Sequence, residues 1–184
     1  MKSIVFFLEE LSAKEMLVGL LPRILPPDVV PLFVVFEGKQ DLEKQLERKL
    51  RGWRAPNSLF VVLRDQDAGN CVSIKSNLAS KCHAAGQPQT LIRIACHELE
   101  SWYLGDLAAV ESALKIKNLA HHQTRRRYAD PDKIVGPSLE LAQLTKQVYQ
   151  KVAGSRAIGP HLSLTNNCSH SFSIFLDGIR RLIP

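Results

Sequence analysis

Four short apolar runs alternate with segments of helical periodicity in the first half of the chain. The apolar runs are residues 3–8, 29–36, 58–63 and 90–95. Between them, apolar residues recur at spacings of three and four, which is typical of amphipathic helices. The predicted helices are residues 12–25, 41–52 and 70–85. This alternation, with short connections, predicts an α/β fold with a mainly parallel sheet of about four strands flanked by helices.

After residue 95 the pattern changes to helical segments alone. Short helices are expected over residues 96–105 and 106–115, a longer one over 136–151, and an amphipathic C-terminal helix over 172–182. Either Ser169 or Ser171 is suited to cap the last of these. We therefore expect an α/β core at residues 1–105, and a helical extension at residues 106–184 packed on it.

The strand ending at Leu63 leads directly into two acids, Asp65 and Asp67. Ligands of open α/β sheets bind outside the carboxyl ends of strands. Two carboxylates about 4 Å apart repel each other by roughly 4 kcal/mol at an effective dielectric constant near 20. A hard divalent cation such as Mg²⁺ or Mn²⁺ would turn this repulsion into attraction. The alternative is that one acid caps the next helix and the other is solvated.

Acids also follow the other expected strands. They are Glu9 after the first strand, Glu37 after the second, and Glu98 and Glu100 after the fourth. The carboxyl ends of parallel strands share one edge of a sheet, so these acids are candidates for the same site. A structural role is the alternative for Glu98 and Glu100, because the helix dipole favours acids in a first turn.

Basic residues exceed acidic ones over the 184 residues: 24 Lys and Arg against 18 Asp and Glu, a formal net charge of +6. This balance makes an anionic partner plausible. The candidate phosphate-binding residues are Arg125, Arg126, Arg127, Lys151 and Arg156. A solvated surface is the alternative reading of this charge.

Several classes of protein are disfavoured. No apolar run approaches the ~20 residues that cross a bilayer, and the apolar start is too short for a signal peptide. The four cysteines form no CxxC pair and no zinc-finger spacing, as expected for reduced thiols in the cytoplasm. Neither GxGxxG nor GxxxxGK[ST] is present, so dinucleotide and P-loop binding are unsupported.

An acid after the first strand, together with Asp-x-Asp after the third, resembles the arrangement of Toprim domains. More closely, the chain resembles an uncharacterised family of small bacterial Toprim-like proteins, related to nucleases of the overcoming-lysogenisation-defect type. The segments that carry this resemblance are 9–12, 37–42, 63–67, 93–106, 128–132, 149–151 and 169–172. They span nearly the whole chain, and residues 98–106 are the most specific.

The resemblance implies a Mg²⁺- or Mn²⁺-dependent phosphodiesterase acting on DNA or RNA. Asp65 and Asp67 would be metal ligands, and Glu9 the general base or a metal-linked acid. The segment at Glu37 looks even more like the Toprim acid motif, but it follows the second strand, so Glu9 is preferred. Glu98 and Glu100 would be supporting acids. Members of this group often lie beside ATPases in phage-defence gene neighbourhoods, which implies an ATPase partner.

Three other functions remain as alternatives. Receiver domains share acids at these strand ends, but need a Thr or Ser after strand four and a Lys after strand five. Phosphatases of the haloacid dehalogenase type use Asp-x-Asp, but after the first strand of their core. The third alternative is a non-catalytic Toprim-like scaffold or regulatory subunit that binds a partner protein or nucleic acid.

Overall fold

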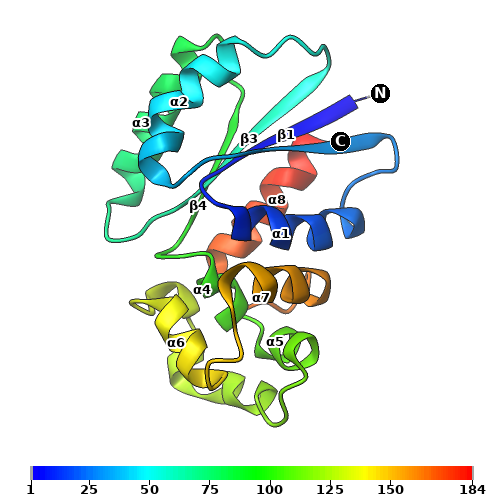
Figure 1. Ribbon diagram of the computed structural model, residues 1–184, viewed down its shortest axis with the longest axis vertical. Helices are drawn as coiled ribbons and strands as arrows, with labels where there is room; N and C mark the ends of the chain where they lie inside the picture. Colours follow the sequence, from blue (N-terminus) through cyan, green and yellow to red (C-terminus); the bar gives the residue numbers. More distant parts are fainter. Residues whose placement is uncertain (1, 184) are drawn as a thin grey trace.

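The computed structural model describes residues 2–183, which form a four-stranded sheet with helices around it (Figure 1). The strands are β1 (Lys2–Leu8), β2 (Val29–Val35), β3 (Ser58–Asp65) and β4 (Leu91–Ala95). They are all parallel and lie in the order β2-β1-β3-β4. The predicted α/β class, the number of strands and their direction are therefore confirmed.

Helices cover both faces of the sheet because its strands are apolar on both sides. On one face, Ile4, Phe6 and Leu8 of β1 belong to the same core as α1 (Leu11–Leu20) and α8 (His170–Leu182). On the other face, Val5 and Phe7 pack with α2 (Lys39–Arg51) and α3 (Cys71–Ala84). The result is three layers, visible in Figure 1.

The first of these cores continues into the second half of the chain. The helices there are α4 (Glu100–Leu104), α5 (Leu107–Leu114), α6 (Pro137–Leu144) and α7 (Lys151–Ile158). Short 3₁₀ turns lie at Leu21–Arg23, Ala120–Thr124, Arg126–Tyr128, Pro131–Lys133 and Gly159–His161. The ring of Trp102 lies 5.2 Å from that of Phe172 and 5.0 Å from that of Phe175. A division of the chain near residue 105 stays a prediction.

The C-terminal helix begins as the sequence predicts. The hydroxyl of Ser169 accepts a hydrogen bond from the backbone N–H of Phe172 at 3.1 Å, which makes Ser169 the cap. Within residues 2–183, no helix is both long and apolar enough to cross a membrane.

The single helix expected over residues 136–151 is wrong. Helix α6 ends at Leu144, and Lys146 and Gln147 take left-handed conformations with φ of 51° and 65°. The Thr145 hydroxyl stabilises this break, because it donates to the Leu141 carbonyl at 2.8 Å and accepts from the N–H of Tyr149 at 3.2 Å. The break sends the chain back toward the sheet before α7 begins.

Candidate functional site

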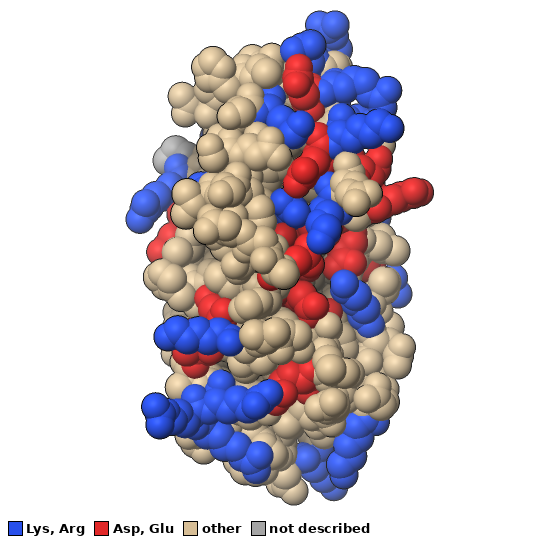
Figure 2. Space-filling model, turned by 90° about the vertical axis from the view of Figure 1, so that its left-hand side faces the viewer, with Lys and Arg blue, Asp and Glu red and all other residues tan. Residues whose placement is uncertain are grey.

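Acids from three neighbouring parts of the fold meet at the carboxyl edge of the sheet. Glu9 and Glu10 follow β1, Asp65 ends β3, and Glu100 begins α4. The carboxylate of Glu9 accepts a hydrogen bond from the backbone N–H of Asp65 at 3.2 Å. Figure 2 shows this side of the molecule, where acids gather in the middle of the face. We call Glu9, Glu10, Asp65 and Glu100 the acid cluster.

Within the cluster, the surroundings of Asp65 are the most unfavourable for an ionised carboxylate. Its exposure is only 9%. Burial, and then the charges of Glu100, Glu9 and Glu10, raise the pKa of Asp65 well above its ordinary value, against the opposing charge of Lys151. Among residues 2–183, no donor hydrogen-bonds its carboxylate. The structure therefore favours a proton or another cation at this position.

Glu100 is fully buried and only half satisfied. The hydroxyl of Tyr149 donates to Glu100 Oε1 at 2.8 Å, whereas Glu100 Oε2 has no partner among the described residues. The hydroxyl of Tyr103 is likewise buried without one. Burial raises the pKa of Glu100, although the Tyr149 bond and the charge of Lys151 oppose the increase. Buried polar atoms without partners are costly, so their presence here needs an explanation.

The negative charge of Glu9 is partly compensated by its neighbours. Burial raises its pKa, and the charges of Asp67 and Glu10 act in the same direction, while the Asp65 N–H and the Arg64 guanidinium lower it. The Nε of Arg64 lies 3.8 Å from Glu9 Oε2, but its Nη1 binds Glu43 at 2.8 Å. Arg64 is thus shared with an acid outside the cluster and compensates Glu9 only in part.

Two lysines partly neutralise the acids. Lys151, at the start of α7, places its Nζ 2.7 Å from Glu10 Oε1. Burial lowers the pKa of Lys151, but the Glu10 hydrogen bond and the charges of Glu100 and Asp65 outweigh it, so that the pKa is raised. Lys39 Nζ lies 2.8 Å from Asp67 Oδ2 on the more exposed side of the site.

The predicted site residues are thus brought together only in part. Glu9, Asp65, Glu100 and Lys151 meet in the cluster, with Asp67 beside it. Glu37 is exposed at the end of β2. Glu98 points to α6 instead, where its Oε2 accepts from the N–H of Ser138 at 2.7 Å. In the structure Glu98 therefore caps the start of α6, and its role as a supporting acid stays a prediction.

The predicted phosphate-binding residues also divide. Arg127 pairs with Glu140 at 2.5 Å, and Arg156 pairs with Glu15 at the same distance. Both guanidiniums already have carboxylate partners. Arg125 and Arg126 are exposed, and within residues 2–183 they form no ion pair. Lys151 alone of this set lies at the acid cluster.

Sequence reasoning missed Glu10 and Tyr149 as members of the site. Glu10 lies one residue beyond the acid that the Toprim pattern marks. Tyr149 depends on the break between α6 and α7, which no glycine or proline announces. The only signal was that residues 149–151 belong to the segments that carry the resemblance.

The ligand atoms suit a hard divalent cation. All four cluster side chains end in carboxylate oxygens, and Glu100 Oε2 is buried without a partner. In the part of the chain that the structure describes, however, no group of three or more His, Cys, Asp or Glu side chains is assembled to hold a metal ion. The chemistry of the donors therefore fits a metal, while the site is not preassembled for one.

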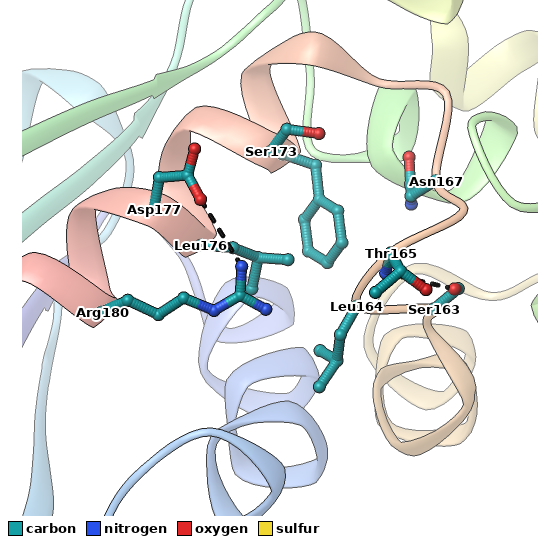
Figure 3. Close-up of a pocket in the computed structure, with 9 residues that line it drawn as sticks. Ser163, Leu164, Thr165, Asn167, Ser173, Leu176, Asp177 and Arg180 are labelled. Carbon is teal, nitrogen blue, oxygen red and sulfur yellow. Dashed lines mark hydrogen bonds and ion pairs between the residues drawn. The ribbon is translucent and has the colours of Figure 1, made fainter.

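A pocket elsewhere in the molecule has fewer groups that could bind a metal ion. It lies between α8 and the loop before it (Figure 3). Its only acid, Asp177, is exposed and lies 3.5 Å from Arg180. Asp177 is therefore a suitable control for substitutions in the acid cluster.

Comparisons with known proteins support a family but no activity. A search of the curated proteins and a search of the solved structures found no match. One family model, described as "Domain of unknown function (DUF4276)", matches residues 8–180. Its match covers β2 to β4, the acid cluster and most of α8, so the chain belongs to the DUF4276 family.

Proposed function

We propose that the chain is a Mg²⁺- or Mn²⁺-dependent phosphodiesterase of the Toprim type that cleaves DNA or RNA. The observation that carries this proposal is the buried carboxylate of Asp65, which lies among other acids and lacks a hydrogen-bond donor. An ionised carboxylate in such surroundings destabilises the folded chain unless a cation or a proton neutralises it. Perturbed acids of this kind concentrate at functional sites.

Each cluster residue has a role in this proposal. Asp65, Glu9 and Glu100 would hold the metal, and Asp67 is a further candidate ligand. When bound, the ion would stabilise charge on the phosphate and lower the pKa of a water molecule. Glu9, whose pKa burial raises, is suited to exchange a proton with the attacking water.

Lys151 is the residue best suited to contact the phosphate directly. Its ammonium group lies beside the acid cluster and keeps its charge because its pKa is raised. An ammonium group donates charge-assisted hydrogen bonds to phosphate oxygens. Tyr149 would position Glu100 through the 2.8 Å bond to its Oε1.

The surface around the cluster suits a polyanion. Figure 2 shows basic residues above and below the central acids. Lys44, Arg48 and Arg54 line one hollow along α2, the helix that begins beside the site at Lys39, and Arg51 of the same hollow pairs with Glu47. Contacts of this kind bind phosphates without reading bases. For a duplex substrate, log K should fall with log salt by about 0.9 per phosphate neutralised.

A non-catalytic scaffold that binds a partner is the second candidate function. Two observations favour it: Glu10 and Asp67 pair with lysines, and no group of three or more possible metal ligands is assembled within residues 2–183. An ATPase partner and a role in phage defence would be compatible with either function. The ATPase partner and the role in phage defence rest on the family resemblance alone.

Titration calorimetry with Mn²⁺ and Mg²⁺, with nuclease activity assayed in the same samples, tests the proposal. We expect the wild type to bind metal and cleave, and Asp65→Asn to lose both. Asp177→Asn removes an exposed carboxylate of α8 and should retain both.

The outcomes separate the two functions. If the wild type binds no metal, the phosphodiesterase proposal fails and the scaffold is favoured. If Asp65→Asn binds metal as the wild type does, the acid cluster is not the metal site.

A further inference from the structure

Two cysteines lie next to each other beside the candidate site. Cys71 is the first residue of α3, and Cys96 directly follows β4. Both line a mostly apolar pocket formed by α3, β4 and α8, and each thiol influences the pKa of the other. Both are partly exposed, so small solutes can reach them. A dithiol in this position has no part in the proposed phosphodiester chemistry.

The other two cysteines provide natural comparisons. Cys82 is 1% exposed, and its thiol interacts with Thr90. Cys168 is exposed in the loop before α8. All four cysteines lie within residues 2–183, and Cys71 and Cys96 are the two that line the same pocket. Intramolecular disulfide chemistry should therefore be confined to this pair.

We propose that Cys71 and Cys96 are a redox-active pair that a peroxide converts to a disulfide. The Cys71 thiolate attacks one oxygen of hydrogen peroxide, the O–O bond breaks, and Cys71 becomes a sulfenic acid as one water leaves. The Cys96 sulfur then attacks the sulfenic sulfur, and its hydroxyl leaves as a second water. The two sulfurs together lose two electrons, the peroxide gains them, and the two thiol protons end in the waters.

The surroundings favour Cys71 as the residue that attacks first. Burial raises the pKa of Cys96 to about 11, so its thiol is rarely ionised. Burial also raises the pKa of Cys71, but this residue begins a helix, whose dipole favours a thiolate. Lys75 follows one turn later in α3 and lines the same pocket.

The bond would join two loops that already touch. The N–H of Asp67 donates to the His97 carbonyl at 2.6 Å, and the N–H of His97 donates to Gln66 Oε1 at 3.2 Å. Asp67 and His97 both have left-handed backbones, with φ of 54° and 56°. A disulfide between residues 71 and 96 would tie the loop after β3 to the loop after β4, next to the acid cluster.

The test is peptide mapping by mass spectrometry after treatment with hydrogen peroxide in mildly alkaline buffer. A Cys168→Ser chain serves as the parent, because it lacks the exposed thiol that would link two molecules. We expect the folded parent to lose two hydrogen atoms and to yield one cross-linked pair of peptides, containing Cys71 and Cys96. Adding Cys71→Ser or Cys96→Ser to the parent should abolish that cross-link.

The same reaction in denaturant controls for reactivity that does not depend on the fold. Unfolded parent should give a mixture of pairings that includes Cys82. The proposal is overturned if the folded parent gains oxygen at Cys71 without a cross-link, if it links either cysteine to Cys82, or if it keeps all its thiols. None of these readouts requires nuclease activity, so the proposed function and this proposal can fail separately.

Discussion

Asp132, which is partly buried, and Asp65, which is buried, are two aspartates with opposite surroundings. Asp132 Oδ1 accepts from the hydroxyls of Ser169 and Ser171, at 2.7 and 3.1 Å, and its Oδ2 accepts from the N–H of Ser171 at 2.7 Å. It fixes the start of α8. Asp65 has no donor at its carboxylate among residues 2–183, and most charged groups around it are acids.

The difference separates a structural carboxylate from a functional one. Hydrogen bonds to a charged group contribute about 1.5–3 kcal/mol each, and the carboxylate of Asp132 accepts three of them. The surroundings of Asp65 instead oppose its ionisation. A residue that destabilises the folded chain in this way is readily explained if its function is to bind a cation or a proton. Substitutions at the two positions should therefore have opposite effects.

The largest effect is expected for Asp132→Ala. It removes three hydrogen bonds and leaves the Ser171 N–H and the Ser169 hydroxyl without their acceptor, so the free energy of unfolding should fall by about 3 kcal/mol. Urea denaturation measures the change. The control Asp130→Ala breaks only an exposed pair with Lys133 and should cost less than about 1 kcal/mol. If the two substitutions lower the free energy of unfolding equally, Asp132 does not have the structural role assigned to it.

Asp65→Asn should have the opposite sign. Without added metal, it removes a charge that burial and neighbouring acids disfavour, so the free energy of unfolding should rise by about 1 kcal/mol at neutral pH. Metal binding and cleavage are expected to be lost in the same protein. A destabilised Asp65→Asn chain would show that this carboxylate is structural, like that of Asp132.

The stabilisation by Asp65→Asn should grow with pH. The pKa values of Asp65, Glu9 and Glu100 are raised by folding, so the folded chain binds more protons than the unfolded chain once the pH exceeds the ordinary carboxyl values near 4. Their contribution to stability is complete below those values and is lost as the pH rises through the folded-state pKa values. Denaturation of both proteins from about pH 4 to about pH 8 should therefore show a widening gap. A constant gap would contradict the raised pKa of Asp65.

Lys39→Met should have the smallest effect. The Lys39–Asp67 pair is exposed, so its loss should change stability by less than about 1 kcal/mol. Freed from its lysine, Asp67 should bind metal better, and the Mn²⁺ affinity measured by calorimetry should increase about twofold to fivefold. Lys44→Met, on the same helix, is the control and should leave the affinity unchanged. If Lys39→Met lowers the Mn²⁺ affinity, Lys39 does not compete with the metal for Asp67.

The sheet was predictable because its strands are apolar on both faces. Apolar runs such as residues 5–8 identify a strand from the local sequence alone. Parallel strands then place their carboxyl ends on one edge of the sheet. The roles of Glu98 and Glu100 were not predictable. Glu98 lies in the bend before α4, whereas Glu100 is the first residue of α4. The donor that engages Glu98 is Ser138, forty residues later in the chain.

Lys151 was predicted to bind phosphate, but its place beside the acids was not predictable. Its place depends on the break after α6, where Lys146 and Gln147 adopt backbones that ordinary residues seldom take. A side-chain hydroxyl, that of Thr145, stabilises this turn. Local propensity favours a continuous helix, and tertiary contacts override it.

The break between α6 and α7 also has a consequence for the order in which the protein is made. The ribosome adds Tyr149 and Lys151 long after Glu9 and Glu10. Until then, the nascent chain has strands β1 to β4 and their acids without the lysine that binds Glu10 or the tyrosine that binds Glu100. The acidic edge is therefore completed only when α7 has been made, and a chain that stalls before α7 would expose an unfinished site.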